Sequence, residues 1–505
     1  MNRFFGRQRE LDELNTILSR EGAQLLLVYG RRQVGKTTLL LNWARQAGWK
    51  LIYWVATHDT PAQVRRGFTH AVWTWAHPGS RAVPRFDTWP EIFETAANLI
   101  GDQRVILIID QFSYAAESDS SLPSNLQAAW DYHFKGRNIV LVLVGSHIGM
   151  MLDLMGYDAP LYGRVTAQIP VDPLPFAYLS EFLPDYSPAD RVAVYAVTGG
   201  VPAYLERFAG HDSVAANVQR LFMRRTGMFR NEPLVLISEV IRRETRNYEA
   251  ILKAIASGKR TPQEIGDLVG LASSYLSPYL KNLEDLRLVE RRIPATTPLE
   301  RRQASRISQY HLADPYLHFY FRFVTPNLGL VEQDKAEVLW RRIAAQFDTF
   351  VGETAFQSLC REWVLAQAQA GQMPFLPEIV GSHWSAEDEV DVVAINWEEK
   401  AILLGTCHWS PEPTGHEVLH RLLSQTGRVV PDRKKWQAHY VVFSQAGFTA
   451  PAEEVAAERQ VRLVDLNTLD ADLRAAVGER ATPEEESAGE DATEEPASSE
   501  EPLEG

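Results

Sequence analysis

One short segment near the N-terminus limits the folds that this chain can adopt. An apolar run from Leu25 to Tyr29 leads into the loop GRRQVGKTT, and an amphipathic stretch follows as far as Trp43. The order of strand, loop and helix with the pattern GxxxxGK[ST] is that of a P-loop, in which backbone N–H groups and a helix N-terminus face a phosphate. The segment therefore predicts a parallel α/β sheet that binds a nucleoside triphosphate.

The residue types of this loop fit a phosphate chain and its metal ion. Gly30 and Gly35 let the backbone curl, Lys36 reaches the β- and γ-phosphates, and the Thr37 hydroxyl can ligate Mg²⁺. We therefore predict ATP and Mg²⁺ as the cofactors. The predicted nucleotide-binding residues of the loop are Gly30, Arg31, Arg32, Gln33, Val34, Gly35, Lys36, Thr37 and Thr38.

Three later apolar runs, 51–56, 105–110 and 139–144, have the pattern of buried parallel strands. Asp110 ends the second run, as a Walker B aspartate does when it supports Mg²⁺ opposite a P-loop. Ser146 follows the third run and is a candidate sensor of the γ-phosphate, with a helix N-cap as the alternative.

Length and charge indicate several folded units and an acidic tail. A chain of 505 residues suggests about three domains of roughly 150 residues each. The net charge is −14, but residues 481–505 hold ten acids and no base, which leaves about −4 for the remainder. We predict that 476–505 is disordered.

The composition also excludes some classes of protein. The two cysteines, Cys360 and Cys407, and the 13 histidines show neither a disulfide framework nor paired zinc-ligand spacing. The start of the chain lacks a signal-peptide core, and no stretch approaches the 18 apolar residues of a membrane span. We expect a cytoplasmic protein without a membrane partner.

Several motifs together resemble the archaeal-type ATPases of the AAA-related STAND group. They are FGRQREL at 5–11, the P-loop, the strand that ends at Asp110, GSH at 145–147, LYGR at 161–164 and GGVP at 199–202. The resemblance implies an AAA-like (ASCE) sheet in which the sensor strand lies between the P-loop strand and the Walker B strand.

The resemblance also implies roles for single residues. Asp110 and Ser146 match the Walker B and sensor positions, and Arg164 matches an arginine that can approach the γ-phosphate, with a surface salt bridge as the alternative. Pro202 matches the GxP turn near the base. Phe5 and Arg7 match the N-terminal segment that closes over the nucleotide.

The residue after Asp110 departs from this pattern. The family usually has glutamate there, whereas this chain has Gln111. A carboxamide can orient the attacking water but cannot accept its proton. We therefore expect slow hydrolysis, unless Glu117 or another acid substitutes.

Residues 248–289 have the pattern of a winged helix-turn-helix. Thr261 and Glu264 form a capping box, and Leu276, Leu280 and Leu283 form the core face of a third helix. Such a module either contacts double-stranded DNA or serves as an internal lid over the nucleotide. For DNA contact, the candidate residues are Ser274, Lys281, Arg291 and Arg292.

The C-terminal region resembles a restriction-endonuclease-like PD-(D/E)xK module (DUF234-type). Asp391 matches its acidic strand and Glu362 is a candidate helix acid, but the Glu-x-Lys positions hold Thr406 and His408. Metal-dependent hydrolysis needs clustered oxygen ligands. We expect a degenerate nuclease fold, with residual cleavage as the alternative.

These inferences define an α/β chain with a P-loop NTPase sheet, an α-rich winged helix-turn-helix and a small α/β restriction-endonuclease-like domain. The predicted domains are 1–235, the ATPase with a helical lid; 236–330, the winged helix; 331–475, the nuclease-like domain; and 476–505, the tail. The expected function is an ATP-dependent switch that hydrolyses ATP slowly and binds DNA or an unknown protein partner, with nucleotide-dependent homo-oligomers as a further expectation. The alternatives are a non-hydrolysing ATP-binding scaffold and an ATP-regulated nuclease.

Overall fold

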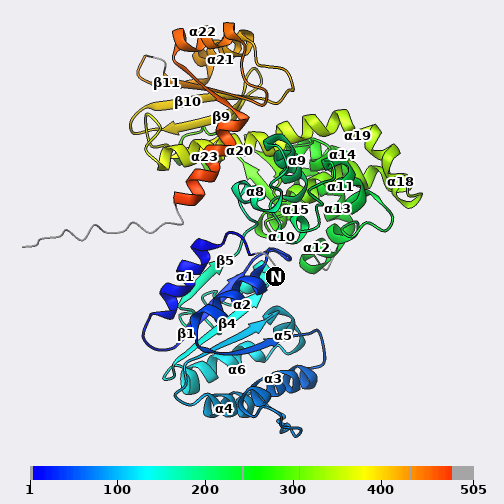
Figure 1. Cartoon of the computed structure of the whole chain (residues 1–505), viewed down its shortest axis with the longest axis vertical. Helices are drawn as coiled ribbons and strands as arrows, with labels where there is room; N and C mark the ends of the chain where they lie inside the picture. Colours follow the sequence, from blue (N-terminus) through cyan, green and yellow to red (C-terminus); the bar gives the residue numbers. More distant parts are fainter. Residues whose placement is uncertain (1–3, 242–243, 306, 433, 480–505) are drawn as a thin grey trace, which may run out of the picture.

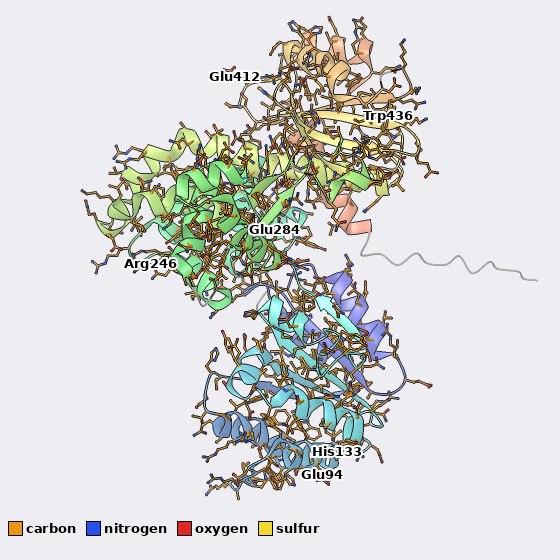
Figure 2. The ribbon with its side chains drawn as sticks, turned by 180° about the vertical axis from the view of Figure 1, so that it is seen from behind. Glu94, His133, Arg246, Glu284, Glu412 and Trp436 are labelled. Carbon is orange, nitrogen blue, oxygen red and sulfur yellow. The ribbon has the colours of Figure 1, made fainter. Side chains whose placement is uncertain are left out.

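The computed structural model describes residues 4–241, 244–305, 307–432 and 434–479. Figure 1 shows three bodies along the long axis: a lower α/β body, a helical body in the middle and an upper α/β body. The view from behind in Figure 2 marks the lower body by Glu94 and His133, the middle one by Arg246 and Glu284, and the upper one by Glu412 and Trp436. The nucleotide-binding motifs therefore lie in the lower body and the nuclease-like motifs in the upper body.

The lower body is built on a five-stranded parallel sheet. Its strands are β1 (Gln24–Tyr29), β2 (Lys50–Val55), β3 (Val105–Asp110), β4 (Ile139–Gly145) and β5 (Ala167–Pro170), in the order β2-β3-β4-β1-β5. Every residue of β1, β3 and β4 is buried, as expected for strands covered on both faces. The sensor strand β4 lies between the P-loop strand β1 and the Walker B strand β3, which confirms the expected fold class.

Helices cover both faces of this sheet. One face packs against α1 (Gln8–Leu18) and α2 (Lys36–Ala47). The other packs against α3 (Pro61–Ala76), α4 (Trp89–Ile100), α5 (Phe112–Ser118), α6 (Leu122–Ala129), the π-helix Trp130–Phe134 and α7 (Ile148–Asp153). Side chains of β1 alternate between the two cores, because successive residues of a strand point to opposite faces.

The middle body begins before the predicted boundary at 235. It opens with a 3₁₀ turn (Phe176–Tyr178), α8 (Leu179–Phe182), α9 (Pro188–Thr198), α10 (Pro202–Leu205), α11 (Val214–Val218), a π-helix (Gln219–Met223) and α12 (Glu232–Val240). Nearly all the buried apolar side chains from Phe176 to Ile241 belong to one core that continues through the later helices. Residues 176–235, which the sequence analysis assigns to the ATPase domain, therefore pack with the helices that follow them.

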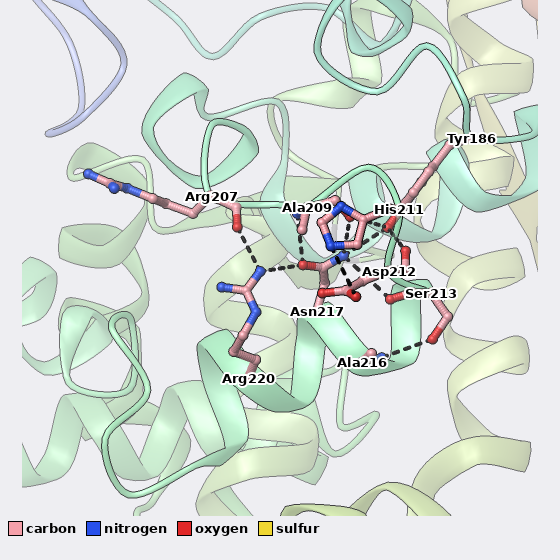
Figure 3. A network of polar contacts seen from close by, with 9 residues as sticks. All are labelled: Tyr186, Arg207, Ala209, His211, Asp212, Ser213, Ala216, Asn217 and Arg220. Carbon is pink, nitrogen blue, oxygen red and sulfur yellow. Dashed lines mark hydrogen bonds and ion pairs between the residues drawn. The ribbon is translucent and has the colours of Figure 1, made fainter.

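A buried asparagine ties the first loops of this body together. The side chain of Asn217 donates to the Tyr186 hydroxyl at 2.8 Å and to the Ala209 carbonyl at 2.9 Å, and its oxygen accepts from the Ala209 N–H at 2.9 Å (Figure 3). Because a buried amide is costly unless its donors and acceptor are paired, this network favours a single conformation of the loop around Ala209.

Three helices and a hairpin follow. They are α13 (Thr245–Ala256), α14 (Pro262–Val269), α15 (Ser273–Asp285) and the antiparallel pair β6 (Val289–Arg292) and β7 (Gln309–Leu312), with α16 (Leu299–Arg302) between the two strands. The capping box of Thr261 and Glu264 is present at the start of α14, and Leu276, Leu280 and Leu283 are buried as predicted.

An aromatic segment then fills the centre of the middle body. It comprises α17 (Pro315–Phe319) and a π-helix (Tyr320–Val324), and it continues through a 3₁₀ turn (Thr325–Asn327), α18 (Leu328–Glu332), α19 (Ala336–Val351) and a π-helix (Gly352–Phe356). Tyr316, Phe319 and Phe323 are buried and contact other aromatic rings, so the segment serves packing.

The upper body is a five-stranded mixed sheet with flanking helices. It contains α20 (Gln357–Gln369), β8 (Ile379–Trp384), β9 (Glu389–Asn396), β10 (Ala401–His408), α21 (His416–Val429), β11 (Gln437–Ser444), α22 (Ala450–Arg459), β12 (Val461–Asp465) and α23 (Leu466–Glu479). The order is β12-β11-β10-β9-β8, with β8, β9 and β10 antiparallel and β10, β11 and β12 parallel. The expected small α/β domain is thus present.

The last helix returns to the middle body. In α23, Asp470 forms a buried ion pair with Arg191 of α9, with 2.7 Å between nitrogen and oxygen. Of the predicted tail, residues 476–479 belong to α23, and 480–505 lie outside the described residues. Among the helices that are described, none is both long and apolar enough to cross a bilayer.

Candidate nucleotide-binding site

The loop after β1 has the backbone of a phosphate cradle. Gln33 and Gly35 have positive φ angles of 67° and 93°, which turn successive N–H groups toward one side. A Cβ atom on Gly30 would lie 2.1 Å from the carbonyl oxygen of Val171, so only glycine fits at that position. The chain geometry therefore fits the phosphate group that the sequence motif predicts.

The ammonium group of Lys36 lies across the mouth of this cradle. Its Nζ donates to the carbonyls of Gly30 at 2.7 Å and Arg31 at 2.8 Å, and to the Ser146 hydroxyl at 3.1 Å. Lys36 is buried, and Ser146 comes directly after β4. The predicted phosphate-binding lysine and the predicted sensor are thus brought together.

The two predicted metal ligands also meet. The Thr37 hydroxyl donates to Oδ2 of the buried Asp110 at 2.6 Å. Tyr53, from the adjacent strand β2, donates to the same oxygen at 3.0 Å, and burial together with the Asp110 charge raises the pKa of this tyrosine. This pair of oxygen groups beside the P-loop fits Mg²⁺, which prefers such ligands.

Gln111 stands where the related ATPases have glutamate, and its backbone is unusual. It has φ 56° and ψ 39°, the left-handed region, and its N–H donates to Asp110 Oδ1 at 2.8 Å. Its carboxamide oxygen is buried and, within the described residues, accepts no hydrogen bond. Because buried acceptors are normally paired, this oxygen is suited to accept a hydrogen bond from a water molecule.

The substitute acid considered for this step, Glu117, lies at the end of α5. Its carboxylate is 3.6 Å from Nε2 of His58. Glu117, His58 and Ser146 line a common cavity of about 250 Å³. Glu117 is therefore on the Ser146 side of the site, and it remains a candidate base.

The second residue of the P-loop is attached to the middle body. Arg31 forms an ion pair with Asp314 and donates to the Tyr204 hydroxyl at 2.8 Å. Burial lowers the pKa of Arg31, but Asp314, Tyr204 and Glu232 together outweigh burial, and the pKa is raised overall. A cavity of about 240 Å³ lies here, bounded by Arg31, Arg32 and Ser146 on one side and by Leu288, Asp314 and Pro315 on the other.

The N-terminal segment also supports the loop. Arg7 is buried and donates to the carbonyls of Val34 at 2.8 Å and Asp172 at 2.6 Å. Phe5 instead packs edge-on against Phe182 of α8. Thus Arg7 braces the P-loop, whereas Phe5 reaches the middle body.

Three other predicted residues lie at or near the loop. Val34 is buried beneath it, and Thr38 is exposed in the first turn of α2. Pro202 opens α10, and it is Tyr204 of that helix that contacts Arg31. The GxP turn therefore reaches the P-loop through Tyr204.

Arg164 does not reach the P-loop of its own chain. Its guanidinium forms an ion pair with Asp131 at 2.6 Å. Two residues after Arg164, the Thr166 N–H donates to the carbonyl of Leu25, which lies at the start of β1. The P-loop follows the other end of β1. Arg164 thus lies at the opposite edge of the sheet, in the salt bridge that was the alternative interpretation.

The candidate DNA-binding residues fall into two groups. Ser274 and Lys281 are exposed on α15. On β6, Arg291 donates to the Ser305 carbonyl at 2.6 Å, and Arg292 forms an ion pair with Glu290. The hairpin arginines are therefore already engaged within the hairpin.

The nuclease-like residues meet only in part. Asp391 accepts hydrogen bonds from Gln357 at 2.8 Å, from the Thr406 hydroxyl at 3.1 Å and from the Cys407 N–H at 2.8 Å. Glu362, by contrast, lies close enough to α9 that burial, together with the Glu362 charge, raises the pKa of Tyr195. Among the described residues no group of three or more His, Cys, Asp or Glu side chains is arranged to hold a metal ion.

Sequence reasoning missed Tyr53, Tyr204 and Asp314 as part of the site. None belongs to a nucleotide-binding motif. Asp314 and Tyr204 reach Arg31 only because the middle body folds back on the P-loop. The single available signal was the Asp-Pro pair that begins α17, where the Asp314 side chain caps the Leu317 N–H at 2.9 Å.

Comparison with known proteins agrees with this site. Residues 4–208 match the family described as an ATPase domain predominantly from Archaea, and 320–418 match a family of archaeal and bacterial proteins of unknown function. An uncharacterized protein of Methanocaldococcus jannaschii, MJECL04, is 28% identical over 409 residues, which cover 80% of this chain and 87% of that protein.

Two solved structures are similar in part. The Walker-type ATPase PABY2304 of Pyrococcus abyssi is 18% identical with a TM-score of 0.47, covering 63% of this chain and 96% of that one. The ORC2 protein of Aeropyrum pernix is 16% identical with a TM-score of 0.42, covering 66% and 96%. The motifs and the sheet order agree with these matches: residues 4–208 are similar to an archaeal-type P-loop ATPase domain, and residues 320–418 are similar to a family of archaeal and bacterial proteins of unknown function.

Proposed function

We propose that the protein is an ATP-dependent molecular switch that hydrolyses ATP slowly. In this proposal, nucleotide occupancy changes how the middle and upper bodies sit on the ATPase sheet, and so controls the binding of DNA or of a protein partner. The observation that carries it is the ion pair between Arg31 of the P-loop and Asp314 of the middle body.

The coupling follows from competition for one cation. Arg31 contacts Asp314 and Tyr204, and its neighbour Lys36 holds loop carbonyls where a phosphate would bind. The triphosphate carries several negative charges, which attract the Arg31 guanidinium and weaken its pairing with Asp314. Two states that differ in this pairing have different affinities for ATP, which is the requirement for a nucleotide switch.

Slow turnover is supported by Gln111. Its buried carboxamide oxygen can position a water molecule but cannot remove its proton. Glu117 is the nearby acid that would raise the rate. The second candidate, a non-hydrolysing scaffold that ATP only stabilises, rests on the same Gln111 and predicts no phosphate release.

The proposal that DNA is the partner rests on α13–α15 with the β6–β7 hairpin, an order of elements compatible with a winged helix. Ser274 and Lys281 are exposed on the third helix of this module. If the hairpin also contacts DNA, replacing Arg291 and Arg292 by alanine removes about two phosphate contacts and flattens the salt dependence of binding by about 1.8 in slope. Failure of the wild type to bind duplex DNA at low salt would leave a protein partner as the proposal.

The ATP-regulated nuclease is the weakest candidate. In an active nuclease the Asp391 carboxylate would bind a metal ion. Here it accepts three hydrogen bonds instead, one of them from Thr406. We propose that the upper body docks a partner and that any homo-oligomer forms in a nucleotide-dependent way.

One experiment tests the switch most directly. Phosphate release by the purified full chain should be slow but measurable, should respond to the partner, and should be lost in Lys36→Ala. Duplex DNA is the first partner to add. A wild-type rate equal to that of Lys36→Ala under all conditions would favour the scaffold.

A further inference from the structure

A second polar cavity lies in the middle body, away from the P-loop. It has a volume of about 290 Å³ and is enclosed by the end of α13, the strand β7, the α17 segment and α19. None of its lining residues lines the cavity beside Arg31. Its polar lining includes Arg260, Arg322, His311, His318, Thr349 and Glu353.

Two arginines dominate the charge of this cavity. Arg260 and Arg322 are each half-buried, and within the described residues neither has a carboxylate at ion-pair distance. Arg260 Nη1 instead contacts the ring nitrogens of His311, at 2.5 and 3.0 Å. A guanidinium can only donate, so the imidazole accepts and is uncharged in this contact.

The carboxylates of Glu353, Glu389 and Glu264 act on the Arg260 guanidinium only through their charge and form no ion pair with it among the described residues, while burial and Arg292 lower its pKa. Burial and the neighbouring Arg292 and Arg260 lower the pKa of His311, and burial with Arg260 lowers the pKa of His318 to about 3. Both imidazoles are therefore neutral at pH 7. Glu353 is the one acid among the lining residues, and its side chain is exposed.

We propose that this cavity is a binding site for the phosphate group of a small phosphorylated molecule. Two half-buried guanidinium groups without acidic partners are costly unless an anion joins them, and arginine pairs with phosphate in a bidentate manner. The Thr349 hydroxyl adds a neutral group that suits a phosphate oxygen, whereas the hydroxyls of Ser257 and Thr354 donate to the carbonyls of Ala254 and Phe350. The volume fits a phosphate with a small organic group and excludes a duplex.

The position of the site suggests what it could influence. Its wall residue His311 lies on β7, and Asp314, the partner of Arg31, follows three positions later. Bound phosphate would order β7 and the start of α17, which carry Asp314. The site therefore goes beyond the proposed switch, since it would be an effector site whether or not the protein hydrolyses ATP.

Calorimetric titration of the full chain with pyrophosphate tests the site independently of the P-loop. In Lys36→Ala, which weakens the P-loop, we expect one remaining binding event. Adding Arg322→Gln or Arg260→Gln to Lys36→Ala should weaken that event at least about tenfold, because each removes a charge-assisted contact. Arg322→Lys, which keeps the charge, should lose less than Arg322→Gln.

The matched control is Arg246→Gln, an exposed arginine on α13 that lies outside the cavity (Figure 2). It should leave pyrophosphate affinity unchanged, and the melting temperature of each variant shows that it is folded. Two results would overturn the proposal. One is that Lys36→Ala does not bind pyrophosphate, and the other is that a folded variant combining Lys36→Ala, Arg260→Gln and Arg322→Gln binds it as tightly as Lys36→Ala does. Competition by a 5′-phosphorylated oligonucleotide, but not by its unphosphorylated form, would identify a nucleic-acid end as the source of the phosphate.

Discussion

Arg31 in the P-loop and Asp314 at the start of α17 form an ion pair that joins the nucleotide site to the middle body. Only 15% of the Arg31 side chain and 10% of the Asp314 side chain are exposed. The Tyr204 hydroxyl occupies a further donor of Arg31 at 2.8 Å. An ion pair shielded to this degree has consequences for both folding and nucleotide affinity when one partner is changed.

Replacing Asp314 by asparagine should loosen the apo protein and tighten ATP binding. The amide keeps an oxygen for the Leu317 N–H but removes the charge that holds Arg31, so unfolding of the apo protein should cost about 3 kcal/mol less. ATP would no longer compete with a carboxylate for Arg31, and its affinity should rise about three- to tenfold in a titration.

A double-mutant cycle separates this pair from general damage. Arg31→Gln combined with Asp314→Asn should be little worse in stability than either single variant, because both remove the same contact. Strictly additive losses, or ATP affinity that does not change in Asp314→Asn, would mean that the pair does not couple the two bodies.

Lys36→Ala should abolish the stabilisation by ATP. Its Nζ is the side-chain cation held over the loop carbonyls, and a charge-assisted contact with the phosphates contributes about 1.5–3 kcal/mol. Differential scanning fluorimetry with and without Mg-ATP measures the effect. If the shift in melting temperature were the same as in the wild type, ATP would bind elsewhere.

Asp110→Ala should make nucleotide binding insensitive to Mg²⁺. The change removes the carboxylate that accepts from Thr37 and Tyr53 and that would support the metal ion. Titration of ATP in the presence of magnesium or of EDTA provides the comparison, and Asp119→Ala, a carboxylate that pairs with Arg65 instead, is the control. Wild-type hydrolysis by Asp110→Ala would show that another carboxylate supports the metal.

Gln111→Glu should accelerate hydrolysis. The carboxylate would stand where the buried carboxamide oxygen now lies, and general-base assistance is typically worth a factor of about 10² to 10⁴. Phosphate release at saturating ATP gives the rate. Glu117→Gln is the informative companion: if it, rather than Gln111→Glu, changes the wild-type rate, Glu117 is the base in use.

Asp391→Ala should leave ATP binding and turnover nearly unchanged, since Asp391 lies in the upper body and is held by Gln357, Thr406 and Cys407. We also expect no cutting of linear or supercoiled DNA with Mg²⁺ or Mn²⁺, because Thr406 and His408 replace the missing carboxylate and lysine. Metal-dependent cleavage that disappears in Asp391→Ala would restore the nuclease hypothesis.

The sequence alone determined the parts whose chemistry lies within a short stretch of chain. The P-loop, the Asp110 strand and the capping box at Thr261 depend on local spacing and apolar patterning, and both are visible in the sequence alone. The sheet order was inferred from family resemblance, and the observed placement of β4 between β1 and β3 agrees with it.

Only the tertiary structure decided which distant residues meet. It paired Arg31 with Asp314, placed Tyr53 on Asp110, and moved Arg164 to the edge of the sheet opposite the P-loop. It also set Arg260 and Arg322 around one cavity. These contacts depend on how whole helices and strands pack, and packing between distant segments leaves no fixed spacing in the sequence, so no local pattern could predict them.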